Sequence, residues 1–160
     1  MIQSNKLAEA FNLPNILNLN PCSAMNKVVE ITIFIKEENI DISFISESHD
    51  RENKKLEDNI DLEDHLVISN IYQRPTKTKG CPAIIANNKK YHIQNLTNTL
   101  INIEMTWTLL IPKESSNNSI VKHIALGAIY VKPSLRKPQK TILYDHIAEV
   151  FNILSAKYGV

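Results

Sequence analysis

The chain has 160 residues, of which 43% are hydrophobic, and this length and composition fit one domain with a buried core. Three glycines and two cysteines are too few for a fold dense in glycine turns or for a disulfide scaffold. The sequence shows no charged, apolar leader and no run of about 20 apolar residues that could span a bilayer. We therefore expect an intracellular protein, in the cytoplasm or nucleus. We expect one domain over residues 1–160, with an N-terminal extension at residues 1–13.

The net charge of +1 hides a strong asymmetry along the chain. Residues 37–64 contain eleven acidic and three basic residues, whereas residues 65–160 contain four acidic and twelve basic residues. Two interpretations stay open. The halves form solvated surfaces of opposite sign, or the basic half lies against a polyanion such as DNA.

The first predicted elements form a β-α-β unit. Residues 15–20 follow Pro14 and have strand character, and residues 42–47 form a second apolar strand. Between them, residues 23–38 place apolar side chains at helical spacing, with Ser23 as a candidate N-cap and Asn39 as a stop. The two strands should be parallel and joined by a right-handed crossover.

After this unit the pattern changes to short strands between polar turns. Residues 48–64 are highly charged and predict an acidic loop. Strands are predicted at residues 65–72, 81–86, 90–94, 103–111 and 122–131, followed by a helix at residues 139–158. Successive short strands favour antiparallel pairing. The sequence therefore predicts an α/β (α+β) domain with one crossover followed by an antiparallel meander.

Two residues follow the carboxyl ends of the parallel strands, where groups from both strands face one crevice. These residues are Asn20 and Glu47. A carboxylate at such a position suits Mg²⁺, and an amide beside it can orient a phosphate. The alternative is that Asn20 begins a turn and Glu47 is a solvated strand end. His49 could reach the rim of the crevice or lie in a solvated loop.

Three local sequences carry a resemblance to a known family. They are LNPCSAMNK at residues 19–27, DISFISES at residues 41–48 and AIYVKP at residues 128–133. In this order they resemble the endonuclease/exonuclease/phosphatase superfamily, in particular the apurinic-endonuclease-like domain of LINE-type (non-LTR) retrotransposons. The resemblance extends over almost the whole chain from Asn15 and corresponds to the amino-terminal part of that domain. It implies a partial four-layer α/β/β/α sandwich of the deoxyribonuclease I-like type and a relation to Mg²⁺-dependent DNA phosphodiesterases.

The resemblance assigns roles to three residues of this chain. Asn20 matches an asparagine that helps to bind phosphate and metal, and Glu47 matches a metal-ligand glutamate. Tyr130 matches a tyrosine whose hydroxyl contacts the scissile phosphate. The basic residues that follow could grip the flanking DNA backbone or form a solvated turn; they include Lys132, Arg136 and Lys137.

The sequence also departs from the family. The family's second half supplies a Gly-Asp-x-Asn element, a later aspartate and an Asp-His pair that activates water, and none of these follows Tyr158. Asp145 and His146 are adjacent, but on a helix their side chains point about 100° apart, so we expect helix surface. We therefore expect a truncated domain that is inactive alone and whose Mg²⁺ and DNA binding is weak or vestigial. The alternatives are a non-catalytic nucleic-acid-binding protein and a decayed, transposon-derived reading frame.

A half-domain should also leave the inner face of its sheet open to water. The candidates for this apolar face are Ile84, Ile103, Met105, Trp107, Leu126 and Ala128. An uncovered face of several hundred Å² exceeds what soluble monomers usually show. We therefore expect self-association through an exposed sheet face.

Overall fold

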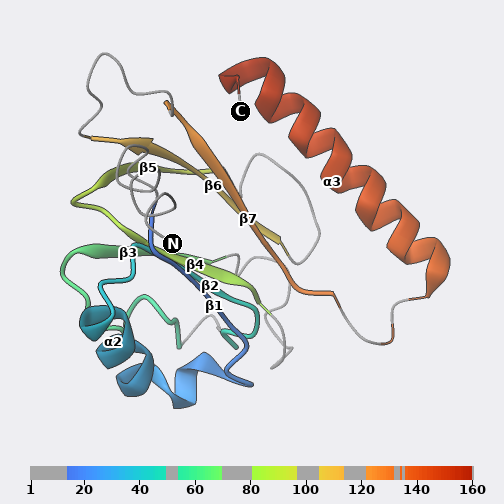
Figure 1. Ribbon diagram of the computed structural model, residues 1–160. Coiled ribbons are helices and arrows are strands. Elements are labelled where there is room, and N and C mark those ends of the chain that lie inside the picture. The colour runs from blue at the N-terminus through green and yellow to red at the C-terminus, as the bar shows by residue number, and fades with distance from the viewer. Residues whose placement is uncertain are drawn as a thin grey trace, which may run out of the picture.

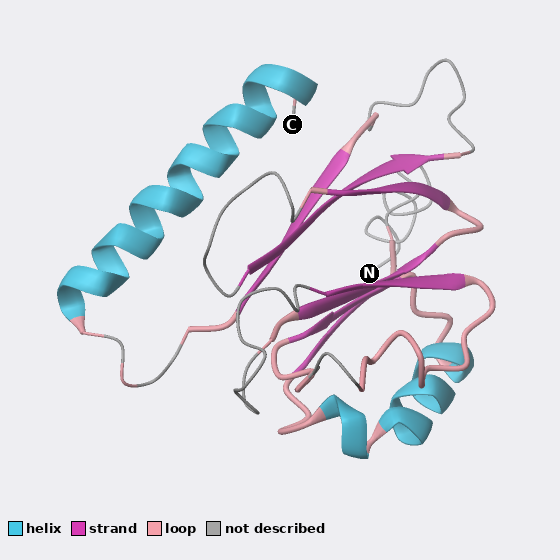
Figure 2. Cartoon of the chain, turned by 180° about the vertical axis from the view of Figure 1, so that it is seen from behind, coloured by secondary structure: helices cyan, strands magenta, loops and turns pink. Residues whose placement is uncertain are grey.

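The computed structural model describes residues 14–49, 54–69, 81–96, 105–113, 122–131, 134 and 136–159. Two β-sheets lie face to face, and one α-helix covers the outer side of each sheet (Figure 1). The view from behind shows the two helices on opposite sides of the paired sheets (Figure 2). The chain is therefore an α/β domain whose layers follow the order helix, sheet, sheet, helix.

The predicted β-α-β unit is confirmed. Strand β1 (Ile16–Leu19) pairs in parallel with β2 (Ile42–Ile45), and α2 (Val28–Glu37) connects them. The expected role of Ser23 is wrong, because its side chain makes no capping hydrogen bond and the α-helix starts only at Val28. A single 3-10 turn, η1 (Ala24–Asn26), comes first, and its Ala24 N–H donates to the Glu47 carbonyl at 3.0 Å.

The first sheet has the strand order β1-β2-β4-β3. Strand β4 (Ala83–Asn87) lies between β2 and β3 (His65–Ser69) and is antiparallel to both. Every residue of β4 except Asn87 is buried, as expected for an inner strand covered on both faces. In the predicted acidic loop, residues 48–49 and 54–64 contain turns and no helix. The expected extension at residues 1–13 lies outside the described residues.

The second sheet is an antiparallel meander, as predicted for this part of the chain. Its strands β5 (Tyr91–Asn95), β6 (Met105–Pro112) and β7 (Ile124–Ile129) pair in sequence order. The long helix α3 (Lys137–Tyr158) follows, with Gly159 in the left-handed conformation at its C-cap. Neither α2 nor α3 is long and apolar enough to cross a membrane, and this finding covers only the described residues.

Three apolar cores hold the four layers together. One lies between α2 and the first sheet and includes Ile31, Ile35, Ile45, Val67 and Ile85. The second lies between the sheets and includes Ile42, Ile68, Ile84, Tyr91, Leu110, Leu126 and Ala128. The third lies between the second sheet and α3 and includes Met105, Trp107, Leu109, Leu143, Val150 and Leu154.

The expectation of an uncovered sheet face is wrong. The described candidates are all buried, namely Ile84, Met105, Trp107, Leu126 and Ala128. Ile103 lies outside the described residues. The antiparallel strands divide into two sheets, so this chain supplies both halves of the inner core. Because side chains alternate along a strand, Met105 and Trp107 point to the opposite face of the second sheet and pack under α3.

Candidate functional site

The carboxyl ends of β1 and β2 lie side by side because the two strands are parallel. Beyond the paired region, the Ser46 N–H donates to the Leu19 carbonyl at 3.1 Å, and the Ala24 N–H donates to the Glu47 carbonyl at 3.0 Å. These bonds hold the segments containing Asn20 and Glu47 next to each other. The predicted proximity of the two backbone positions is therefore correct.

The second sheet brings Tyr130 to the same end of the sandwich. Tyr130 directly follows β7, and Thr106 of β6 lies opposite Ala128, two residues before Tyr130. The buried Thr106 Oγ1 donates to the Pro82 carbonyl at 2.7 Å, immediately before β4 begins. Because the amino end of β4 adjoins the carboxyl end of β2, this bond joins the two sheets at the end that carries Glu47.

The Glu47 carboxylate lies beside the ring of His49. Its Oε2 is 3.4 Å from His49 Nε2, and the side chains are 21% and 17% exposed, respectively. The distance is longer than the 2.7–3.2 Å typical of good hydrogen bonds, and the buried Nε2 has no well-directed hydrogen bond. The two groups therefore form a close, partly buried polar pair at the end of β2. His49 is therefore only partly exposed and lies beside Glu47.

Asn20 is exposed, and its side chain also stabilises a local turn. Its Oδ1 accepts the Cys22 N–H at 3.1 Å, which is the bond of an Asx turn. This bond confirms the alternative in which Asn20 begins a turn. Its side-chain Nδ2 makes no hydrogen bond to the described residues, and the residue is exposed, so this amide can donate to a ligand.

Unusual backbone conformations gather at this end of the sheets. Among the described non-glycine residues, five have positive φ angles, and four of these are Cys22, Ser23, His49 and Cys81. The fifth, Asn39, follows α2, where asparagine in the left-handed region is ordinary. Such conformations cost on the order of 1–3 kcal/mol each and cluster at functional sites.

Ser48 explains how two of these conformations are held in place. Its side chain is fully buried, and both its N–H and its Oγ donate to the Cys81 carbonyl, at 2.9 and 2.6 Å. The bonds tie the segment after β2 to the segment before β4. Sequence reasoning missed this contact, because nothing local marks a serine that bonds to a carbonyl 33 residues away.

The side chains at this end suit a Mg²⁺ ion that is shared with a bound phosphate better than an ion that is enclosed by protein ligands alone. The described residues contain no group of three or more His, Cys, Asp or Glu side chains that could hold a metal. Mg²⁺ often binds through one or two carboxylates, with water and substrate phosphates as its other ligands. Glu47 therefore fits an ion that is shared with a bound phosphate, and does not fit a closed protein cage.

The predicted basic residues follow Tyr130 at the start of α3. Arg136 is the N-cap residue and Lys137 begins the helix, and both are exposed. Lys132 lies outside the described residues. The first turn of α3 contains no acidic side chain. This end of the helix is consequently basic.

The expectation that Asp145 and His146 form helix surface is only half right. Asp145 is exposed, whereas His146 is buried on the side of α3 that faces the second sheet. The Nδ1 of His146 lies 3.6 Å from Glu149 Oε2 on the same helix. The adjacent aspartate and histidine thus point in different directions and cannot act together on one water molecule.

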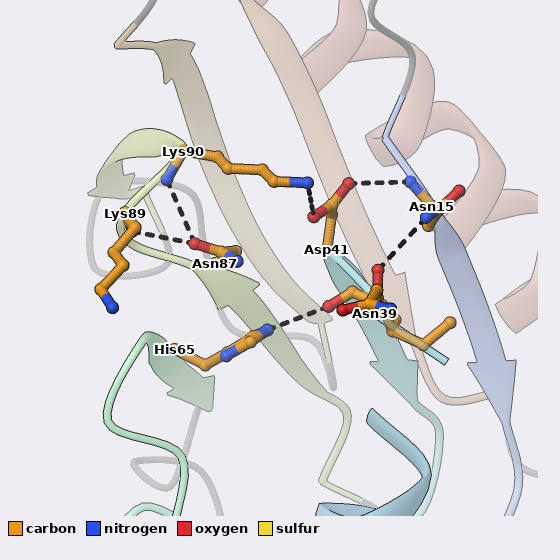
Figure 3. Close-up of polar contacts among 8 residues, drawn as sticks. Asn15, Asn39, Asp41, His65, Asn87, Lys89 and Lys90 are labelled. Carbon is orange, nitrogen blue, oxygen red and sulfur yellow. Dashed lines mark hydrogen bonds and ion pairs between the residues drawn. The ribbon is translucent and has the colours of Figure 1, made fainter. Parts of the chain in front are cut away.

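The opposite end of the first sheet carries a second polar cluster (Figure 3). The Asp41 side chain, only 6% exposed, accepts the Asn15 N–H at 3.1 Å and the Lys90 Nζ at 2.6 Å. His65 Nε2 lies 3.0 Å from the Ile40 carbonyl. Asp41, His65 and Lys90 border a cavity of about 470 Å³. The cluster fastens the amino end of β2 to the connection between β4 and β5.

Charge pairing marks this cluster as structural. Lys89 Nζ lies 2.7 Å from Asp64 Oδ1, and this hydrogen-bonded pair raises the pKa of Lys89. Burial, and then the charge of Asp41, raise the pKa of Tyr91. Three of the carboxylates around the cavity, Asp41, Asp61 and Asp64, have a lysine partner. Sequence analysis gave no indication of this network.

Comparison with known proteins finds no family model and no curated protein that matches this sequence.

Proposed function

We propose that this chain is a phosphodiester-binding domain related to the Mg²⁺-dependent endonucleases of non-LTR retrotransposons, with a deoxyribonuclease I-like fold. The observation that carries the proposal is the convergence of Asn20, Glu47 and Tyr130, from three strands and two sheets, at one end of the sandwich. The local resemblance around each of these residues supports it. The positive φ angles at the same end provide independent support.

Each residue has a distinct role in this proposal. The Glu47 carboxylate binds Mg²⁺, whose charge neutralises a phosphodiester. The exposed Asn20 amide donates to a phosphate oxygen, and the Tyr130 hydroxyl donates to the same group. His49 limits the movement of the carboxylate from one side. Arg136 donates hydrogen bonds to a neighbouring phosphate through its planar guanidinium, and the Lys137 ammonium acts on the backbone as a point charge.

We propose that the 160-residue chain binds DNA without cleaving it. Hydrolysis requires a group that activates water, and a general base typically contributes 10²–10⁴-fold to the rate. The resemblance assigns this step to an Asp-His pair. Asp145 and His146 diverge on α3 and cannot supply it.

The test is the binding of a fluorescent DNA duplex, measured by anisotropy with and without Mg²⁺. Glu47→Gln should abolish the Mg²⁺-dependent part of the affinity. Glu38→Gln, an exposed change beside the opposite end of β2, is the matched control and should retain it. Equal affinity for all three proteins with Mg²⁺ and with EDTA would rule out the proposed role of Glu47.

A nicking assay on supercoiled plasmid tests the second part of the proposal. The wild-type chain with Mg²⁺ should leave plasmid nicking at background. Nicking well above background that Glu47→Gln removes would show that the chain holds a complete active site.

A second candidate function is DNA binding that needs no metal. The basic, exposed first turn of α3 favours it, because Arg136, Lys137 and Lys140 have no acidic neighbour there. In that case affinity persists in EDTA, falls steeply with salt and is lost on Lys137→Glu with Lys140→Glu. A chain that binds no DNA under any of these conditions would instead support a decayed reading frame.

A further inference from the structure

The edge strand β7 differs from the other strands at the margins of the sheets. Among the strands that the structure describes, the outer ones are β1, β3, β5 and β7, and β7 is the longest of these, with six residues. It is also the only one of them without a polar side chain, as its sequence is IALGAI. Natural edge strands are usually protected by charges, proline or bulges. β7, which lies at the margin of the second sheet in Figure 1, contains no charged residue and no proline within its bounds.

The direction of the backbone groups of β7 follows from the neighbouring pairs. The Leu96 N–H donates to the Trp107 carbonyl at 2.9 Å, so the polar groups of Trp107 face β5. Gly127 lies opposite Trp107 on the other side of β6. In an antiparallel ladder, Trp107 and Gly127 are therefore a non-hydrogen-bonded pair. The N–H and C=O of Gly127 consequently point away from β6, toward the free edge.

The same orientation repeats every second residue. The N–H and C=O groups of Ala125 and Ile129 also point outward. Within the described part of the chain, no backbone hydrogen bond reaches β7 from that side. The free edge of β7 thus presents three backbone N–H donors and three backbone C=O acceptors, one of each at every second residue.

We infer that this edge pairs with β7 of a second copy of the chain. In an antiparallel arrangement centred on Gly127, Gly127 lies opposite Gly127 of the second copy and Ala125 lies opposite Ile129. All outward groups of the strand then find partners, and two three-stranded sheets become one sheet of six strands. The strand is symmetric in polarity about Gly127 and carries no charge that would select a different partner.

The position of α3 supports a second copy as the occupant. α3 packs on the face of the sheet that includes Ala125 and Ile129. Pairing through β7 therefore places the two α3 helices on the same face, one on each side of the symmetry axis. On α3, the exposed Ile142 and Ile153 lie on one flank of the sheet-facing side, and the exposed Tyr144 and Phe151 lie on the opposite flank. The flank nearer the symmetry axis therefore offers two large apolar side chains that the other helix can cover.

The dimer should be weak and dependent on concentration. We expect a single strand pair with its flanking helix contacts to bury less than the roughly 1,200–2,000 Å² of a stable interface. Because the strands are antiparallel, the two candidate phosphodiester sites lie at opposite ends of the joint sheet. The inference does not depend on the proposed function.

The first test is sedimentation velocity of the purified chain over a wide range of concentration. The wild-type chain should shift from monomer to dimer as concentration rises. Ala125→Pro removes one outward N–H at a position where an edge strand tolerates proline, and should abolish the dimer. Ala125→Ser keeps the N–H and should retain the dimer. A wild-type chain that stays monomeric at every concentration overturns the inference.

Hydrogen exchange of the wild-type chain provides a test that needs no variant. The amides of Ala125, Gly127 and Ile129 should exchange quickly in the dilute monomer and become protected as the dimer forms. The amides of Leu126 and Ala128, which face β6, should be protected at all concentrations. A dimer in which the three outward amides exchange as in the monomer would place the interface elsewhere.

Discussion

Replacing Gly127 by alanine should destabilise the protein through a direct clash with Trp107. A Cβ at position 127 would lie 2.6, 2.7 and 2.8 Å from the Cζ3, Cη2 and Cε3 atoms of the indole. Carbon atoms at optimal contact are about 3.5–4.0 Å apart. Glycine is therefore required here by the ring across the strand pair, because an aromatic side chain covers the space where a Cβ would stand.

The indole has little freedom to move away. Trp107 is only 2% exposed, and its ring meets Phe151 of α3 edge-on, with centroids 5.9 Å apart and an angle of 88°. The indole can therefore move outward only if Phe151 or α3 itself is displaced. Overpacking of this kind costs typically about 1–3 kcal/mol. For a domain of this size, a loss of about 2 kcal/mol lowers Tm by roughly 4–8 °C.

The assay is urea denaturation followed by circular dichroism, which gives the free energy of unfolding. Gly159→Ala is the matched control: Gly159 has a φ of 68° and no atom within 4 Å of the position that a Cβ would take, so only backbone strain of about 1 kcal/mol is expected. Combining Gly127→Ala with Trp107→Leu should make the alanine nearly harmless, since the obstructing ring is gone. The reasoning would be refuted if Gly127→Ala had the free energy of unfolding of the wild type. It would also be refuted if Gly127→Ala lowered the free energy of unfolding equally with Trp107 and with Leu at position 107.

Three further changes test the polar interior. Asp41→Ala should lower the free energy of unfolding by about 1–3 kcal/mol in the same urea assay, because this buried carboxylate accepts two hydrogen bonds or ion pairs. Ser43→Ala should stay within about 0.5 kcal/mol of wild type, because the buried Ser43 hydroxyl has no partner among the described residues; a large loss would reveal a bond. Folding raises the pKa of Tyr91 above 10.0, so stability should be complete below that pH and fall above it. The raised pKa of Lys89 acts in the same direction. Tyr91→Phe should therefore flatten the alkaline decline seen in melting curves, and an unchanged pH profile would contradict the assignment.

The local elements of the fold could be predicted because their signals are local. Period-two and helical spacing of apolar residues mark β1, α2, β2 and α3, and the short connection through α2 leaves parallel pairing as the simple solution. Periodicity does not show which strands share a sheet. The turn between β4 and β5 resembles a hairpin connection, yet these two strands pair with different neighbours.

The chain passes from the first sheet to the second at this turn because of contacts between residues that are distant in sequence. Lys90 is bound to Asp41, and Tyr91 is buried between the sheets, so the turn carries the chain from one sheet to the other. Neither contact leaves a pattern in the local sequence. An antiparallel meander was therefore expected to form one sheet with an open face, whereas the chain builds two sheets that close on each other.

The candidate site likewise combines positions that local sequence patterns predict with contacts that they do not. The positions of Asn20 and Glu47 follow from the parallel pairing of β1 and β2, which local patterns predict. The contact between Ser48 and Cys81, and the positive φ angles around it, arise from tertiary hydrogen bonds that hold non-glycine residues in uncommon conformations. Sequence patterns can nominate the chemical groups at such a site, but the strained backbone that presents them depends on the closed fold.

The closed core changes what a negative activity assay would mean. If one sheet face were open, loss of nicking could be attributed to misfolding, but among the described residues each sheet packs against a buried core on both of its faces. Glu47 is partly exposed and lies beyond the end of β2, so Glu47→Gln should leave the unfolding transition close to that of the wild type. A change in Mg²⁺-dependent DNA affinity without a change in stability would therefore locate the effect in the site itself. A parallel loss of stability and affinity would instead identify Glu47 as a structural residue at the end of β2.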